Sequence, residues 1–494
     1  MPEYEHNHRQ LLTTIAHQAM LDRGLIPDFS SEIKAELERL LIRSRLQVVG
    51  SANDLRDMRS MLWCSIDDDD SLDLDQLTVA EQLPDNTVKI YVAIADVDAL
   101  VKKGTAIDQR AEHNTATVYT VGMIFAMLPE EISTGLTSLN FNEDRSSVVV
   151  EMTINEDGSL KDSAVYMALV RNKAKLAYNS VAAWLEGQAP IPEKAAMIKG
   201  LAENLILQDA AAQKMKEFRH NHGALSLETV ESRPVFSGDQ ILSMEFETKN
   251  RAREVVENFM IVANGVTARF LSQNIRPSIR RVVSIPDRWE RIVEIAARYQ
   301  YQLPATPDAK VLEEFLVKQR TDDPLRFPDL SLSIIKLLGA GEYTATVPDG
   351  NLPGHFSLAV KDYGHSTAPN RRFTDLVTQR LIKSAIANTH APYTLQELQA
   401  IAEHCTQAED AGNKVERQVE KSADAMLLEH RIGEKFDAII TGAAEKGTWV
   451  RLTALPVEGK LMQTLNHPDV GDRIKVQLIG VDVQKGYIDF NEVN

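Results

Sequence analysis

The spacing of apolar residues predicts a helical beginning for this chain. Apolar residues recur at helical spacing between positions 11 and 20, and Pro27 lies beyond them. Ser30 and Ser31 can cap a second amphipathic helix. We therefore expect residues 1–55 to form a helical, helix-turn-helix-like module, and a helical packing arm fits the same pattern.

The middle of the chain mixes strand and helix patterns. Strand-like runs rich in β-branched residues occur at Met61–Ile66, Val88–Ile94 and Val148–Ile154. Helical patterns extend over residues 192–222 and 250–273, and another begins just after Pro369. Thr394 and Glu397 have the spacing of a capping box, which opens a long helix that ends near Leu428. Residues 56–430 thus predict one large α+β domain with a mixed β-sheet and surrounding helices.

The last segment, residues 431–494, changes to short alternating strands separated by glycines. The strand-like runs are Phe436–Ile440, Trp449–Leu452, Arg473–Leu478 and Tyr487–Asn491. About five short strands at this spacing predict a small barrel of the oligonucleotide-binding type.

Length and charge add limits. The chain has 494 residues, which corresponds to about three domains at roughly 150 residues each. Its 71 acidic residues exceed its 54 basic residues, so the formal net charge is −17. That balance argues against a generic polyanion binder but does not exclude one basic groove. Arginines cluster between Arg269 and Arg298, where some fit a solvated helix face and others a groove that tracks phosphates.

Other features narrow the class of protein. Only Cys64 and Cys405 are cysteines, so neither a disulfide framework nor a cysteine zinc site is expected. The polar start has no apolar signal region, and no run approaches the ~18 apolar residues of a membrane span. The P-loop motif does not occur. We predict a cytoplasmic monomer without a nucleotide cofactor or membrane contact. His220 and His222 fall at a predicted helix end and are left out of any metal site.

The strongest chemical signal is the acidic segment Ser65–Leu77, which follows a predicted strand. Its acids are Asp67, Asp68, Asp69, Asp70, Asp73 and Asp75. Carboxylates this close repel one another unless water or a cation neutralises them, and oxygen ligands select ions such as Mg²⁺, Mn²⁺ or Ca²⁺. Counted from Asp67, position 6 is Leu72 instead of glycine, which excludes an EF-hand. Interleaved leucines favour a partly buried metal site, and a solvated surface loop is the alternative.

Ordered blocks of the sequence resemble the ribonuclease II superfamily. Ile66, Asp67, Asp73, Asp75 and Gln76 resemble its signature IDxxxxxDxDD, with Gln76 where a fourth Asp is usual. Further blocks are YVAIADV at 91–97, Tyr119 with MLPEEIS and LTSL at 127–139, VENFMIVAN at 256–264 and APNRRFTD at 368–375. The terminal segment is similar to an S1 domain, with Phe436, Gly442, Gly447 and Val450 at the expected places.

The resemblance implies a processive, hydrolytic 3′-to-5′ exoribonuclease that degrades single-stranded RNA, with structured RNA as a further substrate, to nucleoside 5′-monophosphates. The implied cofactor is Mg²⁺, with Mn²⁺ as an alternative, because paired divalent ions activate water and neutralise phosphate charge. The implied metal ligands are Asp67, Asp73, Asp75 and Gln76. The implied catalytic residues are Asp67, Asp73, Asp75 and Arg371, and the implied contacts to the RNA 3′ end are Tyr119, Tyr178, Glu257, Arg371 and Glu420.

These side chains also have structural explanations. Arg371 can pair with Asp375 at i,i+4 spacing, and Glu257 can pair with Arg253 on one helix. Tyr178 can be a packed tyrosine. Glu420 can belong to a charged, solvated helix face.

Three departures from the family pattern bear on function. An amide at Gln76 brings no charge, so one ion would be held less firmly. Leu227 stands where some members place a base-stacking Phe. Members commonly carry two cold-shock barrels before the catalytic domain, whereas residues 1–55 have a helical pattern. We hypothesise that this leaves the RNA entrance more open to duplex regions.

Three functions therefore stay open at the level of sequence. The first is an active exoribonuclease that depends on divalent metal. The second, which follows from Gln76, is an RNA-binding regulator that keeps the scaffold but has impaired catalysis. The third is a metal-dependent nuclease that acts on DNA.

Overall fold

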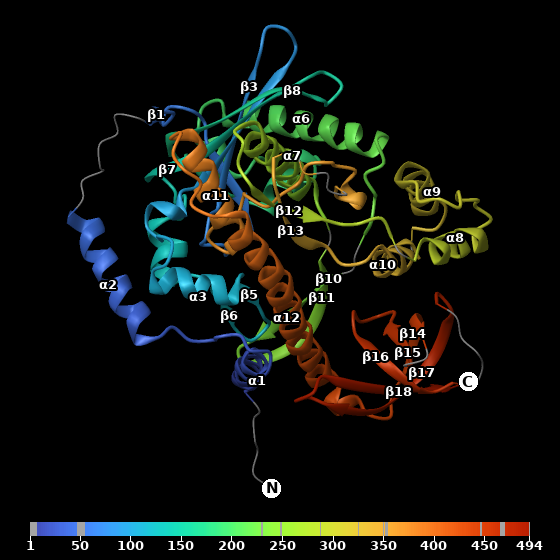
Figure 1. The fold of residues 1–494 in the computed structure, drawn as a ribbon. Helices are drawn as coiled ribbons and strands as arrows, with labels where there is room; N and C mark the ends of the chain where they lie inside the picture. The colour runs from blue at the N-terminus through green and yellow to red at the C-terminus, as the bar shows by residue number, and fades with distance from the viewer. Residues whose placement is uncertain are drawn as a thin grey trace.

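The computed structural model describes residues 7–46, 55–228, 231–247, 249–286, 288–324, 326–348, 350, 354–444, 447–464 and 470–493. A seven-stranded sheet lies at the centre, helices pack around it, and a small barrel forms the C-terminal end (Figure 1). This arrangement confirms the predicted α+β class.

The central sheet is mixed, with the order β1-β8-β7-β4-β3-β2-β9. Its strands are β1 (Arg56–Asp57), β2 (Cys64–Asp67), β3 (Gln76–Gln82), β4 (Val88–Ala95), β7 (Asp144–Ile154), β8 (Leu160–Arg171) and β9 (Ala174–Ala177). The β1–β8 and β2–β9 pairs are parallel, and the other pairs are antiparallel. The predicted strands correspond to β2, β4 and β7, although β2 begins at Cys64 rather than at Met61.

The main helices between residues 106 and 428 confirm most of the sequence pattern. They are α3 (Ala106–Asn114), α4 (Tyr178–Leu185), α5 (Glu193–Ala196), α6 (Leu201–Asn221), α7 (Arg251–Gln273), α11 (Phe373–Ile386) and α12 (Leu395–Leu428). The capping box at Thr394 is present, because its side chain and that of Glu397 each accept a bond from the other's backbone N–H. The predicted single helix over 192–222 is wrong. Gly200 has a φ of +85° and separates α5 from α6.

Buried β-branched residues hold this sheet together. Val92 on β4 pairs with Val150 on β7, and both are fully buried. Phe259 of α7 and Phe373 of α11 join the same core. Each such side chain contributes about 1.5–3 kcal/mol on burial. The acidic segment connects β2 to β3, so it is anchored at both ends in this sheet.

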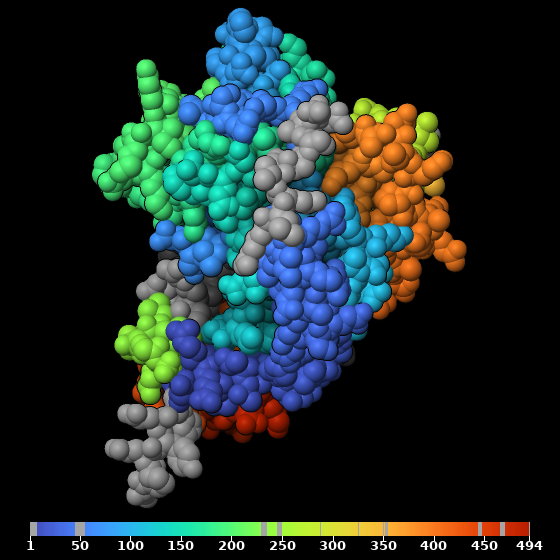
Figure 2. Space-filling view, turned by 90° about the vertical axis from the view of Figure 1, so that its left-hand side faces the viewer, coloured from blue at the N-terminus to red at the C-terminus, as the bar shows by residue number. Residues whose placement is uncertain are grey.

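The two N-terminal helices pack on different parts of the molecule. They are α1 (His8–Asp22) and α2 (Ser31–Leu46), and Ser30 Oγ accepts the Ile33 N–H at the start of α2. Helix α1 packs on α12, and α2 packs on α3. Leu12 of α1 shares a core with Val415 and Val419 of α12. Figure 2 shows both helices in blue on one face, with the yellow-green β10–β11 hairpin beside α1.

Smaller units complete the chain. The two-stranded hairpins and sheets are β5 (Val118–Tyr119) with β6 (Ile124–Phe125), β10 (Glu231–Ser237) with β11 (Gln240–Glu247), and β12 (Ser278–Val282) with β13 (Glu342–Thr346). A three-helix unit comprises α8 (Trp289–Arg298), α9 (Ala309–Asp322) and α10 (Phe327–Leu338). Leu227, which stands where some members have a base-stacking Phe, packs partly buried against the core of this unit.

The terminal barrel is closed, in the order β14-β15-β16-β18-β17. Its strands are β14 (Lys435–Ala444), β15 (Gly447–Leu452), β16 (Glu458–Gln463), β17 (Arg473–Asp482) and β18 (Tyr487–Val493). Val450, Leu478 and Phe490 lie in its core. Arg451 of the barrel is 2.6 Å from Asp329 of α10, which joins the barrel to the three-helix unit. In the part of the chain that the structure describes, no helix is both long and apolar enough to cross a bilayer.

Candidate active site

The first acid of the signature stands at the end of a strand, next to one of the predicted tyrosines. Asp67 closes β2, and in the parallel β2–β9 pairing it lies opposite Ala177. Tyr178 follows Ala177 directly, so the sheet register brings it to the acidic segment. The Asp67 carboxylate accepts hydrogen bonds from the Asp68 N–H at 2.8 Å and from the Ser71 hydroxyl at 2.9 Å. These bonds fold the segment back on itself.

The next acids occupy the return of this segment into the sheet. Asp73 is half-buried, and Asp75 is 2% exposed. The Ala95 N–H donates to the Asp75 carbonyl oxygen at 2.9 Å, which ties the segment to the end of β4. Gln76 begins β3, where it is buried opposite Ile94. The alternative of a solvated surface loop therefore fails at Asp75, while it fits the exposed Asp68–Asp70 run.

The loop before α11 delivers an arginine to the most deeply buried acid. Arg371 Nε donates to Asp75 Oδ2 at 3.2 Å, and the Asn370 N–H donates to Asp75 Oδ1 at 3.1 Å. The expected alternative, a pair between Arg371 and Asp375, does not form. Asp375 instead binds Arg372 through both carboxylate oxygens and accepts the Ala368 N–H. This leaves the Arg371 side chain directed toward the acidic segment.

Tyr119 approaches the same acids from the β5–β6 hairpin. Its hydroxyl is 3.4 Å from Asp73 Oδ2, and its backbone N–H donates to Glu416 Oε1 of α12 at 2.7 Å. Tyr119 as a whole is 42% exposed, so part of it is accessible to a ligand. Glu416 was not expected from the sequence. It lies four residues before Glu420 on the same helix, and that i,i+4 spacing was the only signal available.

The two predicted glutamates belong to two different helices, Glu257 to α7 and Glu420 to α12. Glu257 of α7 pairs with Lys249 at 3.7 Å. Arg253 instead reaches Asp68 at 2.6 Å and lies 4.8 Å over the Tyr178 ring. Thus α7 faces the acidic segment, with Glu257 one turn beyond. Among the described residues, Glu257 therefore pairs with a lysine rather than with the signature aspartates.

Burial and mutual repulsion shape the charges of this site. Burial, with the neighbouring Asp73 charge adding to it, raises the pKa of Asp75 to about 7 despite Arg371. Burial also raises the pKa of Asp73, and the Asp67 charge acts in the same direction. Burial acts to lower the pKa of Arg371, but the carboxylate of Asp75 and the other acids raise it overall. Asp67, Asp73 and Asp75 thus carry more acidic groups than Arg371 alone balances.

The donor set fits a divalent metal. Within the described ranges, no three His, Cys, Asp or Glu side chains already converge closely enough to ligate one ion. Asp67, Asp73 and Asp75 nevertheless offer only oxygen atoms, which suit a divalent cation. The raised pKa values of Asp73 and Asp75 show that a positive charge beside them would be favourable. The Arg371 side chain is 46% exposed, so it has room to turn away from Asp75.

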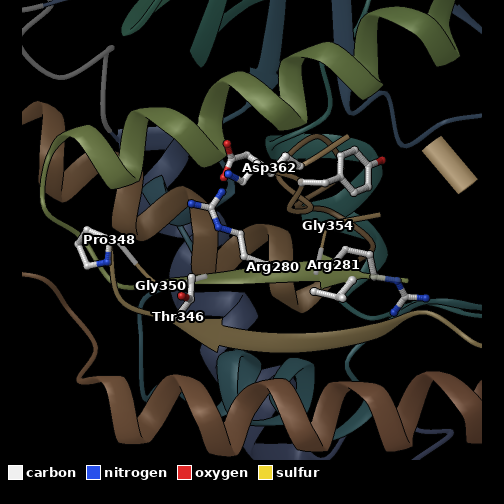
Figure 3. A pocket seen from close by; sticks show the side chains of 10 residues that line it. Arg280, Arg281, Thr346, Pro348, Gly350, Gly354 and Asp362 are labelled. Atoms are coloured by element: carbon white, nitrogen blue, oxygen red, sulfur yellow. The ribbon is translucent and has the colours of Figure 1, made fainter. Parts of the chain in front are cut away.

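The arginine cluster expected to form a groove divides into buried and exposed members. Arg280 is 5% exposed and donates to the Ala268 carbonyl and to Ser272. Figure 3 shows Arg280 directed toward Asp362 beside a cavity of about 30 Å³, while Arg281 points elsewhere. Arg281 pairs with Glu409. These arginines serve the packing of β12.

The exposed members line a cleft between the three-helix unit and the barrel. The cleft has a volume of about 590 Å³, and its charged and aromatic lining includes Arg288, Arg291, Arg298, Tyr299, Arg326, Lys336, Trp449, Asp329 and Asp472. Five of these nine side chains are basic. Strand β15, which carries Trp449, belongs to the face with which oligonucleotide-binding barrels contact nucleic acid.

Residues 55–388 match the model of the RNB domain, and this match covers more than half of the chain. The chain belongs to the RNB family. Residues 434–493 of this RNB protein match the RNase II-type exonuclease C-terminal S1 domain. Ribonuclease R of Aquifex aeolicus (strain VF5) is 29% identical over 468 residues, which are 88% of this chain and 64% of that protein. The RNB chain spans about three-fifths of the length of the first curated relatives it matches.

Solved structures share the fold of this RNB protein. Mycoplasma genitalium RNase R in complex with ribose methylated single-stranded RNA superposes with a TM-score of 0.85 at 22% identity, covering 98% of this chain and 78% of that one. Yeast Ssd1, described as a pseudonuclease, superposes with a TM-score of 0.66 at 17% identity, covering 89% of this chain and 53% of that one. At these identities the likeness concerns the fold.

Proposed function

We propose that this RNB protein is a 3′-to-5′ exoribonuclease that hydrolyses single-stranded RNA to nucleoside 5′-monophosphates with divalent metal. The observation that carries the proposal is the direct contact of Arg371 with Asp75 inside the matched domain. It brings a phosphate-binding donor and a metal-binding acid to one point from positions 296 residues apart. A relative named ribonuclease R and a neighbour bound to single-stranded RNA support the same assignment.

The proposed roles follow from the geometry of the site. Asp67, Asp73 and Asp75 hold the metal ions, with the amide of Gln76 as a neutral neighbour. When bound, such ions supply an activated water and neutralise charge on the scissile phosphate. Arg371 turns its guanidinium from Asp75 to the phosphate oxygens as the transition state develops. Tyr119 lies beside Asp73, where it can stack on a base at the RNA 3′ end.

The remaining predicted contacts are assigned to the RNA chain near its 3′ end. Tyr178 adjoins Asp67 and is proposed to stack on a second nucleotide. Glu257 is proposed to accept a 2′-hydroxyl, which would favour RNA over DNA. Glu420 is one helical turn from Glu416, and we assign it to the same end of the RNA.

An RNA-binding protein with impaired catalysis is the second candidate. Gln76 replaces a charged residue of the signature, and a protein described as a pseudonuclease shares the fold. We favour the active enzyme because Asp67, Asp73, Asp75 and Arg371 are all present.

One experiment separates these functions. Single-stranded RNA labelled at either end, and the matching DNA, are incubated with Mg²⁺, Mn²⁺ or EDTA. We expect monophosphates to be released from the RNA 3′ end only, and EDTA to stop their release. Binding of RNA without products in either metal would select the RNA-binding regulator. Equal cleavage of DNA would select a metal-dependent nuclease that acts on DNA.

The cleft between the three-helix unit and the barrel is proposed to hold RNA phosphates. If it does, RNA affinity should fall steeply with salt. The slope of the logarithm of the binding constant against the logarithm of the salt concentration should be about −0.7 per phosphate contact. Arg288→Gln and Lys336→Gln together should make the slope shallower by about 0.7 to 1.4. Lys161→Gln is the control, because Lys161 pairs with Asp85 at the surface, outside the cleft. Equal slopes for all variants in a fluorescence-anisotropy titration would remove the cleft from the RNA path.

A further inference from the structure

Helix α1 touches the hairpin that carries Tyr119, at the turn that follows this tyrosine. The β5–β6 hairpin pairs Tyr119 with Ile124, and its turn is closed by bonds from the Thr120 N–H and hydroxyl to the Met123 carbonyl. The turn contains Gly122. A Cβ added at Gly122 would lie 2.6 Å from the Leu12 carbonyl carbon and 2.7 Å from the Thr13 nitrogen, both in α1. The two backbones are therefore in direct contact.

The Thr13 hydroxyl also reaches this contact, where its one proton is shared between two carbonyl acceptors. The Thr13 hydroxyl is 3.1 Å from the Gly122 carbonyl oxygen and 2.9 Å from the carbonyl of Arg9, one turn earlier in α1. Below the turn, Phe125 of β6 and Leu12 of α1 are buried in one cluster with Val118 of β5. Helix α1 thus holds the hairpin by polar and apolar contacts together.

Helix α1 is itself held in place from its other side. The Arg9 guanidinium lies 4.2 Å over the ring of Phe236 in the β10–β11 hairpin, and the Arg9 N–H donates to Asp239. Leu12 and Ile15 pack with α12, the helix whose Glu416 accepts the Tyr119 N–H. The backbone of Tyr119 is therefore held by Glu416 of α12, and the turn that follows Tyr119 is held by α1.

We propose that α1 is a positioning element for the RNA 3′ end, in which Thr13 and Gly122 set the place of Tyr119 beside Asp73. This inference rests on the proposed RNA-binding role of Tyr119. Among the described contacts, Thr13 and Gly122 bond to each other and to α1, so in this proposal they act through the hairpin. In this proposal Tyr119 binds the RNA equally strongly in the ground state and in the transition state. A shift of the hairpin therefore raises KM and leaves kcat unchanged.

The test compares Thr13→Val with Thr13→Ser and with Thr14→Val. Thr13→Val keeps the shape of the side chain but removes the hydroxyl, and Thr13→Ser restores it. Thr14 is the matched control, because it is exposed on the same helix and its hydroxyl bonds only to the Gln10 carbonyl among the described contacts. Gly122→Ala is the stronger variant, since its Cβ meets backbone atoms. Melting temperatures show which variants fold.

RNA affinity in EDTA and steady-state kinetics in Mg²⁺ are measured for each variant. We expect Thr13→Val to weaken affinity and raise KM by about threefold to tenfold, as loss of one hydrogen bond does. Gly122→Ala should change both by more than about tenfold, and the two controls should match the parent protein. In a Tyr119→Ala background, Thr13→Val should have no further effect.

The outcomes are distinguishable from those of the proposed function. If the parent protein binds RNA without hydrolysing it, the exoribonuclease assignment fails, while the affinities still decide the role of α1. The positioning role would be overturned if Thr13→Val had the RNA affinity and KM of the parent protein. It would also be overturned if Thr13→Val weakened RNA affinity just as much in the Tyr119→Ala background.

Discussion

Asp75→Asn is expected to stop RNA hydrolysis while the protein still folds and binds RNA. Asp75 is the most deeply buried acid of the segment, and it contacts both Arg371 and the Asn370 N–H. An asparagine has the same shape but supplies no negative charge to a metal ion. Because transition-state charge is then poorly neutralised, kcat should fall by at least about 10³-fold. Single-turnover release of monophosphates in Mg²⁺ measures this loss.

The control for this variant is Asp70→Asn, which makes the same chemical change at an exposed acid of the same segment. It should retain hydrolysis within about twofold, as surface substitutions usually do. RNA affinity in EDTA should be similar for both variants and the parent protein. Full activity of Asp75→Asn would show that the acidic segment does not hold the catalytic metal.

Arg371→Lys and Arg371→Gln should each lower kcat by about 10²- to 10³-fold, the usual cost of removing one transition-state donor. Lysine keeps the charge but cannot present two parallel N–H groups to a phosphate, so it should rescue only a small part of the activity. Since Arg371 also balances the charge of Asp75, the glutamine variant leaves that carboxylate unpaired. A larger loss of kcat for Arg371→Gln than for Arg371→Lys would show the contribution of the positive charge beside Asp75.

Kinetics in Mg²⁺ and melting temperatures distinguish catalysis from folding. Arg372→Gln is a useful contrast, because Arg372 binds Asp375 and holds the start of α11. That variant should lower the melting temperature, whereas Arg371→Lys, which keeps a positive charge beside Asp75, should not. If Arg371→Lys retains full kcat, the guanidinium is not a transition-state donor, and a structural pair with Asp75 becomes its function.

Local patterns in the sequence determined the long elements and their ends. The capping box at Thr394 and the apolar spacing that follows it predicted α12 through Leu428, because both signals involve residues close in the chain. The prediction of a single helix over 192–222 was wrong because it used the same kind of local pattern. Gly200 interrupts it with a left-handed backbone that a glycine alone adopts readily, and the sequence pattern around it stays helical.

The candidate site could be assembled from sequence only as a set of residues. The acidic segment and the ordered family blocks pointed to Asp67, Asp73, Asp75 and Arg371. Their partners could not be predicted, since each competing pair was equally compatible with helical spacing. The structure gives Asp375 to Arg372, and it gives Arg253 to Asp68. Glu416 was missed because its contact with Tyr119 spans 297 positions.

The sequence alone thus determined the α+β class, the terminal barrel, the acidic segment and the family resemblance, because periodicity and motifs reside in neighbouring residues. The tertiary structure decided which side chains share a charge and which are buried. It placed Arg280 in the interior and Arg288 at a cleft, although both belong to one basic run. It also brought α1 against the hairpin of Tyr119. Such choices depend on packing between distant segments, where burial changes the free energy of a charge or a backbone contact far more than local spacing does.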